Sequence, residues 1–395
     1  MELVMKKDIV VIGAGPAGLS FANSLANTGL NILLVESQSK DALSDPAIDG
    51  RDIALTHSSE KLMTAMDTWS RIPADEIFPI KEAMVVDGDS EYAMHFDRAR
   101  IPEEMLGFIV SNHVIRKALY DKASSLENVE ILTDVSVTAV KTDEAAAEVT
   151  LSNGATLKAA LVISADSRFS ETRRKMGISA DMHDFGRVCI VCRVTHEHSN
   201  QGIAHECFFY GQTLAVLPLS ENESSIVITV SSNMADRIMS MNAETFSRHV
   251  EGQFNSKLGR MELSTERFPY PLVAVWANKF AGQRYAVIGD AAVGMHPVTA
   301  HGFNLGLKSQ HTLARLIKDA HKAGTDIGAS ALLKRYEFAH RKAAKPIYLG
   351  TNAIVKLFTN DMPLHRLARK AVLRFGNAFP PVKRIITRQL TETSG

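Results

Sequence analysis

DIVVIGAGPAGLSFANSLANTGLNILLVE, residues 8–36, is the stretch that decides the fold of this chain. An apolar, β-branched run at 9–12 leads into the pattern G-x-G-x-x-G, and a helical spacing of apolar residues follows at Leu19, Ala22, Leu25 and Ala26. A second apolar run at 32–35 then ends in an acidic residue. This order predicts a strand, a helix and a parallel strand, with the glycines in the first turn.

The three glycines of this turn have separate physical roles. The first permits the tight turn, the second lets a pyrophosphate approach the backbone, and the third lets helix and strand pack closely. The helix N-terminus offers N–H groups to the phosphates, and the terminal carboxylate accepts from ribose hydroxyls. The motif predicts dinucleotide binding over a plain structural turn, but alone it does not separate FAD from NAD. The residues expected to bind are Gly13, Gly15, Pro16, Ala17, Gly18 and Glu36.

The composition is that of a large globular enzyme. With 395 residues, of which 45% are hydrophobic and 22% charged, the chain can bury a sizeable core and is expected to form two domains. Its 44 basic and 44 acidic residues balance, so no nucleic-acid partner is predicted. We expect neither a signal peptide nor a transmembrane helix, because the uncharged stretch 9–35 contains glycines, a proline and three asparagines that fit the βαβ unit better.

The three cysteines do not indicate a disulfide framework. Cys189 and Cys192 form a C-x-x-C, which is open to interpretation as a redox pair or as half of a zinc site. They lie in a strand-like run without the turn residues of a redox motif, and their odd spacing puts them on opposite sheet faces. We therefore expect Cys189, Cys192 and Cys207 to be small core residues in a reduced cytoplasmic protein without a metal site.

The rest of the chain divides into strand-rich and helix-rich stretches. A helix is expected through Leu62, Ala65 and Trp69, and another begins at Asn112. Beyond Gly306 the pattern is helical to the end. Strands are expected at 129–132, 135–140, 147–151 and 160–164, with an Asn153-Gly154 hairpin turn, at 188–194, 206–210, 213–217 and 225–230, and at 285–290.

Two further segments point to a family. ADSRFSETR at 165–173 and GDAAVGMHPVTAHGFNLGL at 289–307 follow the glycine turn in the order and spacing of class A FAD-dependent aromatic hydroxylases, the superfamily of p-hydroxybenzoate hydroxylase. Within that group the pair His296-Pro297 and the ending Gly302-x-Asn304-x-Gly306 resemble the ubiquinone-biosynthesis hydroxylases of UbiH type. The stretch Thr299 to Gly302 resembles their UbiM branch.

The resemblance implies an α/β, p-hydroxybenzoate-hydroxylase-like fold. A Rossmann-type FAD-binding domain would comprise residues 1–75, 98–178 and 270–340. An inserted β-sheet substrate domain would comprise 76–97 and 179–269, and C-terminal helices would occupy 341–395.

The resemblance also assigns site residues. Asp290 would accept from the ribityl chain, and the turn 300–304 would aim N–H groups at the pyrimidine edge of the flavin, stabilising negative charge by roughly 0.3–2 kcal/mol. His296, Pro297 and His301 are the expected catalytic residues, although a structural hydrogen bond remains open for His296. The further cofactor-binding residues expected are Arg51, Asn112, Arg116, Asp166, Gly289, Asp290, Gly302, Phe303 and Asn304.

The chain departs from the family pattern at three places. Ala300-His301 stands where the broad family has Gly-Gln, so His301 either contacts flavin or substrate or fills the glutamine's place. Val293 stands where many members have histidine. Asp166-Ser167 replaces a usual Asp-Gly, which leaves FAD binding intact but puts the docking of the reductant in doubt.

The implied activity is that of an FAD-dependent monooxygenase that hydroxylates a prenylated phenol in ubiquinone biosynthesis. It would use NAD(P)H and O₂ through a flavin C4a-hydroperoxide, with the substrate on the sheet of 188–230 and the 76–97 insertion. No second G-x-G-x-x-G is present, as expected if NAD(P)H binds transiently. The alternatives are a reductase or dehydrogenase of the geranylgeranyl-reductase type and a flavin-binding, non-catalytic subunit of a ubiquinone-biosynthesis complex.

The C-terminal segment 363–375 has apolar positions along one helix face. Seven Lys or Arg against two acidic residues fall between Asp361 and Gly395. Such a helix, within 363–390, either contacts an anionic membrane or packs on the protein itself. The expected location is cytoplasmic, with peripheral contact to the inner membrane as the open alternative.

Overall fold

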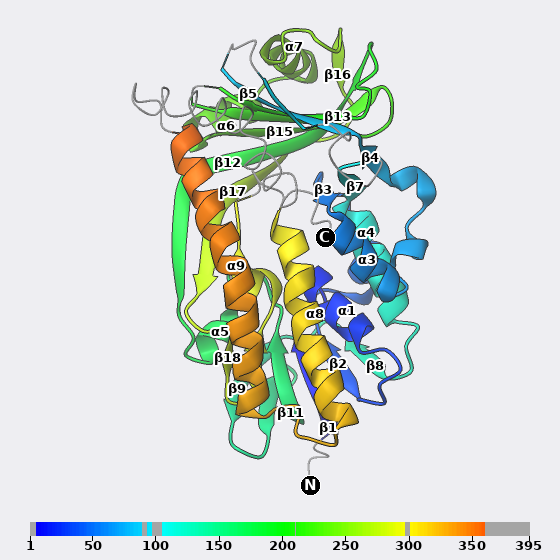
Figure 1. Cartoon of the computed structure of the whole chain (residues 1–395), viewed down its shortest axis with the longest axis vertical. Helices are drawn as coiled ribbons and strands as arrows, with labels where there is room; N and C mark the ends of the chain where they lie inside the picture. Colours follow the sequence, from blue (N-terminus) through cyan, green and yellow to red (C-terminus); the bar gives the residue numbers. More distant parts are fainter. Residues whose placement is uncertain (1–4, 89–92, 97–104, 210, 297–300, 360–395) are drawn as a thin grey trace.

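A computed structural model describes residues 5–88, 93–96, 105–209, 211–296 and 301–359 of the chain (Figure 1). In this part of the chain one sheet has eight strands, in the order β18-β19-β11-β1-β2-β8, with β10 beside β11 and β9 beside β10. The pairs β1–β2, β1–β11, β2–β8 and β11–β19 are parallel, which confirms the fold class expected from the opening βαβ unit. The strands are β1 (Met5–Ile12), β2 (Ile32–Val35), β8 (Val129–Leu132), β9 (Val137–Thr142), β10 (Ala147–Leu151), β11 (Thr156–Ser164), β18 (Ala281–Gly282) and β19 (Tyr285–Val287).

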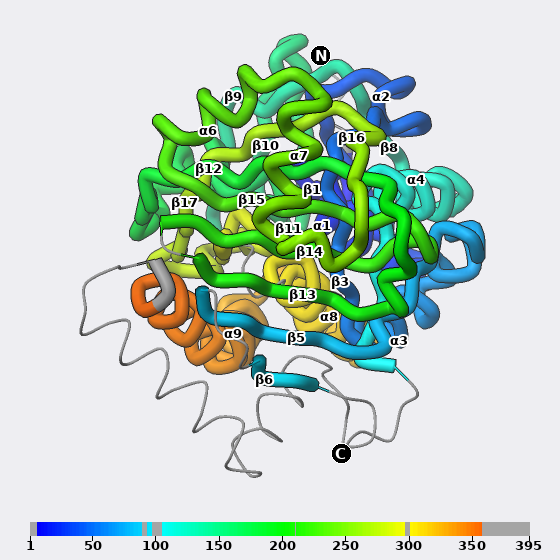
Figure 2. Tube along the Cα trace, turned by 90° about the horizontal axis from the view of Figure 1, so that it is seen from above, coloured from blue at the N-terminus to red at the C-terminus, as the bar shows by residue number. Residues whose placement is uncertain are grey.

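A second, mostly antiparallel sheet has nine described strands, in the order β20-β17-β12-β15-β14-β13-β5-β6, with β16 beside β12. Helices α6 (Ser232–Met239) and α7 (Ala243–Gln253) cover its outer face, and α8 lies on its inner side in both views (Figures 1 and 2). The strands are β5 (Glu82–Asp87), β6 (Ala93–Phe96), β12 (Ala180–His196), β13 (Ile203–Phe208), β14 (Thr213–Pro218), β15 (Glu223–Ser231), β16 (Met261–Leu263), β17 (Phe268–Ala277) and β20 (Val293–Gly294).

The cysteines lie in this second sheet, and all three are free and buried. Cys192 and Cys207 pack in the cluster beneath α6 and α7, whereas Cys189 packs with Val191 and Leu272 on the inner face. The opposite-face prediction is therefore confirmed. Burial raises the pKa of all three thiols to about 12, so they stay protonated at neutral pH. No group of metal-ligating side chains is found among the described residues.

A small three-stranded sheet joins the two larger ones through β3 (Asp52–Leu55), β7 (Gly107–Ser111) and β4 (Phe78–Ile80). Helix α3 (His57–Ala65) follows β3, and its N-terminus is capped by the Thr56 hydroxyl. The sequence predicted helix as far as Trp69, but α3 ends at Ala65. Asp67 takes a left-handed conformation with φ of 56°, which breaks the helix, and Trp69 begins a separate 3₁₀ turn, η1 (Trp69–Arg71).

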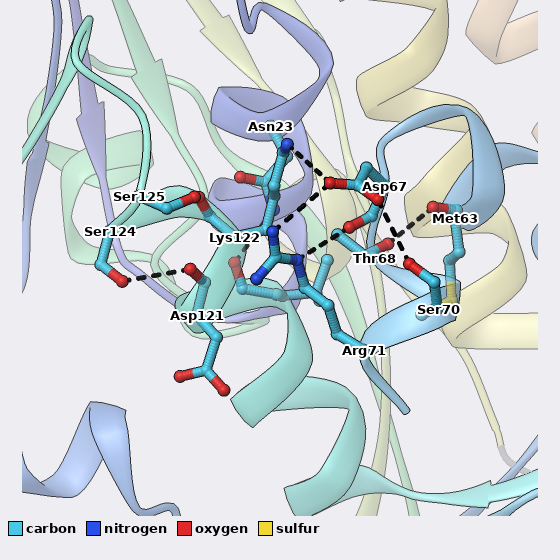
Figure 3. A network of polar contacts seen from close by, with 11 residues as sticks. Asn23, Met63, Asp67, Thr68, Ser70, Arg71, Asp121, Lys122, Ser124 and Ser125 are labelled. Atoms are coloured by element: carbon cyan, nitrogen blue, oxygen red, sulfur yellow. Dashed lines mark hydrogen bonds and ion pairs between the residues drawn. The ribbon is translucent and has the colours of Figure 1, made fainter. Parts of the chain in front are cut away.

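Exposed polar contacts fix this turn against α4 (Asn112–Ala123), as Figure 3 shows. The Lys122 ammonium lies 2.9 Å from the Asp67 carboxylate, which also accepts from Ser70 at 3.2 Å. These contacts and those of Arg71 hold the pKa of Asp67 below its usual value. Exposed pairs of this kind add little to stability, so the network orients the turn more than it stabilises the fold.

Two long helices complete the described chain. Helix α8 (His301–Lys322) packs on α1 (Pro16–Ser24), where the Ser24 hydroxyl donates to Gln310 at 2.8 Å in the core. Helix α9 (Ser330–Thr359) packs on α8 and runs through Pro346. No described helix combines the length and hydropathy needed to cross a bilayer. The shorter helices are α2 (Lys40–Ser44), η2 (Ala74–Glu76), α5 (Glu171–Lys175) and η4 (Gly289–Ala291).

The proposed domain boundaries stay a prediction. Strands β5 and β6, from 76–97, and β12 to β16, from 179–269, pair in the nine-stranded sheet, and β20 joins it from a later segment. The basic segment 363–390 lies outside the described residues.

Candidate flavin site

The glycine turn after β1 is shaped to receive a phosphate. Gly13 has φ of 101°, and a Cβ there would lie 2.6 Å from the carbonyl oxygen of Ala165. A Cβ at Gly18 would collide with the carbonyl oxygen of Gly13, whereas Gly15 faces open space. Helix α1 has no side-chain cap and no acidic residue in its first turn, which includes Pro16 and Ala17. Its first N–H groups are therefore available to an anion.

Glu36 lies at the end of β2, directly beside this turn. One carboxylate oxygen accepts from the backbone N–H of Ala14 at 2.8 Å, and the other accepts from that of Gln38 at 2.9 Å. The residue is buried, with 8% of its surface exposed. Glu36 thus fixes the phosphate-binding turn to the second strand.

A polar cluster forms where β3 meets α4. Arg51 lies 2.6 Å from the carboxylate of Asp49, and Asn112 donates to the same carboxylate at 2.7 Å. Burial raises the pKa of Asp49, but the hydrogen bonds and charge of Arg51 outweigh that effect and leave the pKa below its usual value. Arg116 donates to the Gln38 side chain at 3.4 Å, two residues beyond Glu36. The structure thus brings Arg51 and Asn112 together through Asp49. The sequence did not indicate Asp49, because a single aspartate outside any motif gives no pattern to read.

The segment after β11 closes the other side of the glycine turn. Asp166 accepts from the hydroxyls of Ser164 and Ser170 and from the backbone N–H of Thr172 at 3.1 Å. Ser167 has φ of 80°, the left-handed region that glycine adopts at least cost. A serine at this position therefore carries a conformational cost that a glycine would not. In this structure Asp166 shapes the turn that supplies the Ala165 carbonyl.

The second motif crosses directly over the first. Gly289 has φ of 60°, and a Cβ there would lie 2.6 Å from that of Ala17. The next residue, Asp290, is partly exposed and lies 3.0 Å from Arg168. Arg173 is 1% exposed and donates to the carbonyl of Ala291 at 2.6 Å. Both arginines belong to the 165–173 segment. Their spacing of five residues matches neither a helix nor a strand period, so the sequence did not indicate these contacts.

Helix α8 begins beside this motif. The Asn304 amide donates to the carbonyl of Ala54 at 2.9 Å, and its oxygen accepts from the Thr56 N–H at 3.2 Å and the Ser59 hydroxyl at 2.6 Å. His301 is buried, Phe303 packs partly against the main core, and Gly302 faces open space. The first turn of α8 contains no acidic residue, so its N–H groups also favour negative charge.

His296, within the second motif, lies against the nine-stranded sheet. Its ring meets Phe185 of β12 edge-on, with ring centroids 5.0 Å apart. Burial, and then the charge of Arg187, lowers the pKa of His296 to about 4, so the imidazole is neutral at pH 7. Pro297 lies outside the described residues. The catalytic assignment of His296, Pro297 and His301 stays a prediction.

These elements fit a dinucleotide with a charged ring system. The glycine turn, the 165–173 segment and the second motif touch one another. A Cβ added at Gly306 of α8 would lie 3.7 Å from the Cα of Gly289. Two helix N-termini and a basic side chain serve the same region, while acidic residues are held by neighbouring donors. The residues present fit a dinucleotide such as FAD, because α1 and α8 would offer N–H groups to its negatively charged parts.

The family of the FAD binding domain matches residues 6–348. The chain is 50% identical over 391 residues to ubiquinone hydroxylase UbiM of Neisseria meningitidis, covering 98% of this chain and 85% of that protein. The chain belongs to the ubiquinone-hydroxylase family of FAD-dependent monooxygenases. It is also 33% identical over 386 residues to ubiquinone hydroxylase UbiL of Rhodospirillum rubrum, covering 98% of this chain and 90% of that protein.

Solved structures agree on the fold of this monooxygenase. The p-nitrophenol 4-monooxygenase PnpA of Pseudomonas putida superposes with a TM-score of 0.79 at 19% identity, covering 99% of both chains. The anhydrotetracycline hydroxylase OxyS of Streptomyces rimosus superposes with a TM-score of 0.73 at 18% identity, covering 99% of this chain and 77% of that chain. The predicted fold, the FAD cofactor and NAD(P)H as co-substrate are confirmed, and the family favours the hydroxylase over the reductase and the non-catalytic subunit.

Proposed function

We propose that this flavoprotein adds one oxygen atom to the aromatic ring of a prenylated phenol in ubiquinone biosynthesis. The observation that carries the proposal is the 50% identity to UbiM over nearly the whole chain. The motifs on both sides of the flavin site fall within that alignment. The cofactor-binding part and the substrate-binding part of this chain therefore both resemble UbiM. FAD reduced by NAD(P)H supplies the oxygen chemistry, and the protein supplies binding, orientation and electrostatics.

The described residues divide these tasks. The N-terminus of α1 binds the pyrophosphate, Glu36 accepts from the ribose, and Arg51 contacts the phosphates. The N-terminus of α8 stabilises negative charge on the flavin, and Asp290 accepts from the ribityl chain. Neutral His296 separates the flavin from the apolar face of the sheet, where exclusion of water protects the reactive oxygen.

The substrate is proposed to lie between this flavin site and the inner face of the nine-stranded sheet. Phe185, on that face, reaches His296, and Tyr270 donates to the Asp49 carbonyl at 2.7 Å. The sheet therefore stands directly against the cofactor side, and its apolar side chains suit a prenyl group.

The test is turnover of the purified FAD-loaded chain. NAD(P)H oxidation is followed with and without a prenylated phenol, under labelled O₂, with mass spectrometry of the product. One labelled oxygen on the ring is expected. Substrate-independent NAD(P)H oxidation, or a product without label, would contradict the hydroxylase and favour a reductase.

Contact of 363–390 with anionic membranes and with other enzymes of the pathway is a separate proposal. Its support is the basic, amphipathic sequence alone. Cosedimentation with anionic vesicles, but not with neutral ones, is the expected result. Equal recovery in both supernatants would mean that the helix packs on the protein.

A further inference from the structure

The inner face of the nine-stranded sheet carries one carboxyl group in an apolar row. Strand register places seven side chains across this face at one level, because residues paired across strands point to the same side. Six of the seven are apolar, and the seventh is Glu206 on β13. The row runs Met94, Val85, Glu206, Ala215, Val227, Val191 and Phe268.

This face is the one that meets the FAD-binding part. Phe268 lies against Gly50, where an added Cβ would meet its ring. Two residues beyond Val191 on β12, and on the same face, Arg193 binds the Asp52 carboxylate at 2.7 Å. The residues on either side of Glu206 in sequence face the other way, since His205 stacks edge-on with Phe254 and Cys207 packs beneath α7. Glu206 therefore lies on the face of the sheet that meets the FAD-binding part.

Glu206 lies at the border of two separate apolar clusters on this face. One contains Phe208 and Met94, and the other contains Val191 and Cys189. The Glu206 carboxylate is close enough to add to the effect of burial in raising the pKa of Cys189. Its neighbour in the row, Ala215, is small and leaves room beside it. The carboxyl group thus reaches across the middle of the inner face.

No hydrogen bond or ion pair satisfies this carboxyl group within the described residues. Enclosure by protein raises the pKa of Glu206 to about 8, so the group is mostly neutral at pH 7, yet the residue is still partly accessible. Buried polar groups are normally hydrogen-bonded, and leaving one unsatisfied is costly. A carboxyl group kept without a partner, on the apolar face that meets the FAD-binding part, is typical of a ligand contact.

We propose that Glu206 binds the hydroxyl group of the aromatic substrate and so fixes the orientation of the ring over the flavin. This inference rests on the proposed function, because it requires a phenol. A carboxylic acid offers both a donor and an acceptor, which matches a phenol hydroxyl. The six apolar side chains of the row would then contact the ring and its prenyl chain, while Glu206 sets which ring carbon faces the flavin.

The test combines a change in the enzyme with a change in the ligand. FAD-loaded wild type, Glu206→Leu and Glu206→Gln are titrated with the prenylated phenol and with its methyl ether, and binding is followed by the flavin absorbance. Glu206→Leu is expected to weaken binding of the phenol by about tenfold to a hundredfold and to leave binding of the ether unchanged. Glu206→Gln keeps a donor and an acceptor, so we expect it to bind the phenol within a few-fold of wild type.

Glu262→Gln on β16 is the matched control, because this carboxylate is exposed on the same sheet. It should change neither affinity. A loss equal for phenol and ether would show that Glu206 acts only on the fold, and no loss for either would show that it does not meet the substrate. Failure of the proposed function itself is seen separately, when wild type neither binds nor hydroxylates any phenol.

Thermal unfolding gives a second readout. Replacing an unsatisfied buried carboxyl by leucine should leave the melting temperature unchanged or raise it, because the wall becomes uniformly apolar. If Glu206→Leu loses FAD, the comparison of phenol with ether is made with Glu206→Ala, whose side chain also has neither a donor nor an acceptor. In that case a tenfold loss confined to the phenol still supports the contact, and equal binding of both ligands in wild type and variant overturns it.

Discussion

Single backbone positions set the geometry around the flavin. Ser167 and Gly289 both have φ in the left-handed region, one in each of the segments that meet the glycine turn. Only glycine adopts this conformation without a steric cost. The two positions differ in consequence, because Ser167 is exposed whereas Gly289 is packed against Ala17. Opposite substitutions are therefore informative at the two sites.

Ser167→Gly should stabilise the protein. The substitution removes the strain of a non-glycine residue at φ of 80° and is expected to raise the free energy of unfolding by about 0.5–1 kcal/mol. Urea titration of the FAD-loaded protein measures the change. The control is Ser240→Gly at φ of −80°, where the extra freedom of glycine should lower stability instead. Equal effects at both sites would refute the strain argument.

Gly289→Ala should damage the cofactor site. The new methyl group would lie 2.6 Å from the Ala17 Cβ, and φ of 60° adds strain of about 1–3 kcal/mol. We expect less than half of the wild-type FAD content after purification, measured by flavin absorbance. Gly252→Ala in α7 has open space around it and should keep full FAD content. Full FAD content in Gly289→Ala would mean that the two motifs do not touch as described.

Among the elements, α8 does the most to join the parts of the site. It packs on α1 and contacts the second motif, and the Asn304 side chain ties it to β3 and α3 with three hydrogen bonds. The sequence analysis assigned Asn304 to the cofactor by family resemblance. Its side-chain amide bonds to protein groups at β3 and α3, which fixes the α8 N-terminus, and its assignment to the cofactor stays a prediction.

Asn304→Ala should loosen this junction. It leaves the Ala54 carbonyl and the Thr56 N–H without their partner, at a cost of about 2–4 kcal/mol in unfolding free energy. A weaker FAD dissociation constant is expected in parallel. Asp67→Asn in the exposed network of Figure 3 is the control, and its unfolding midpoint should stay within error of wild type. Similar losses in both variants would contradict the importance of the buried junction.

At the scale of the whole molecule, polar contacts join the nine-stranded sheet to β3 and to the loop before it. Arg193 binds Asp52, and Tyr270 donates to the Asp49 carbonyl. Elsewhere in the described chain several ionisable groups are buried, among them His205, His296 and His340. Burial of these groups makes the stability of the whole fold depend on pH.

Acid should destabilise the protein through its buried histidines. Burial lowers the pKa of His205, His296 and His340 to about 4, below the ordinary 6.5 of the unfolded chain. Their contribution is fully present above pH 6.5 and is lost as pH falls toward 4, by at most about 1.4 kcal/mol per pH unit for each histidine. Urea unfolding at pH 7 and pH 5 measures the loss. His340→Phe, between Phe280 and Tyr336, should reduce it, and an unchanged loss would refute the assignment.

Glu206 should act in the opposite direction. Its pKa of about 8 lies above the ordinary 4.5, so its contribution is complete below pH 4.5 and is lost as pH rises toward 8. Stability should therefore fall between pH 7 and pH 8.5 in wild type and less so in Glu206→Gln. The measurement is again urea unfolding, with Glu262→Gln as control. Parallel curves for wild type and Glu206→Gln would contradict an enclosed carboxyl group.

The sequence by itself determined the nucleotide-binding half and the class of the protein. The βαβ unit, the opposite faces of Cys189 and Cys192, and most strands follow from local periodicity, which short-range sterics and burial enforce. The first glycine motif indicates a dinucleotide site because other residues do not permit such close backbone contacts, and FAD was implied by the family resemblance of the later segments. Periodicity alone predicted α3 too long, because Asp67 ends the helix through its left-handed backbone conformation and not through the apolar pattern.

Only the tertiary structure decided which distant residues meet. Asp49 joins Arg51 to Asn112, Asn304 turns toward β3, and Glu206 points inward from a strand whose neighbours in sequence point outward. Such contacts depend on the register of strands and on the packing of helices over long sequence separations. No local pattern encodes them, because the partners come together only when the sheets close on each other.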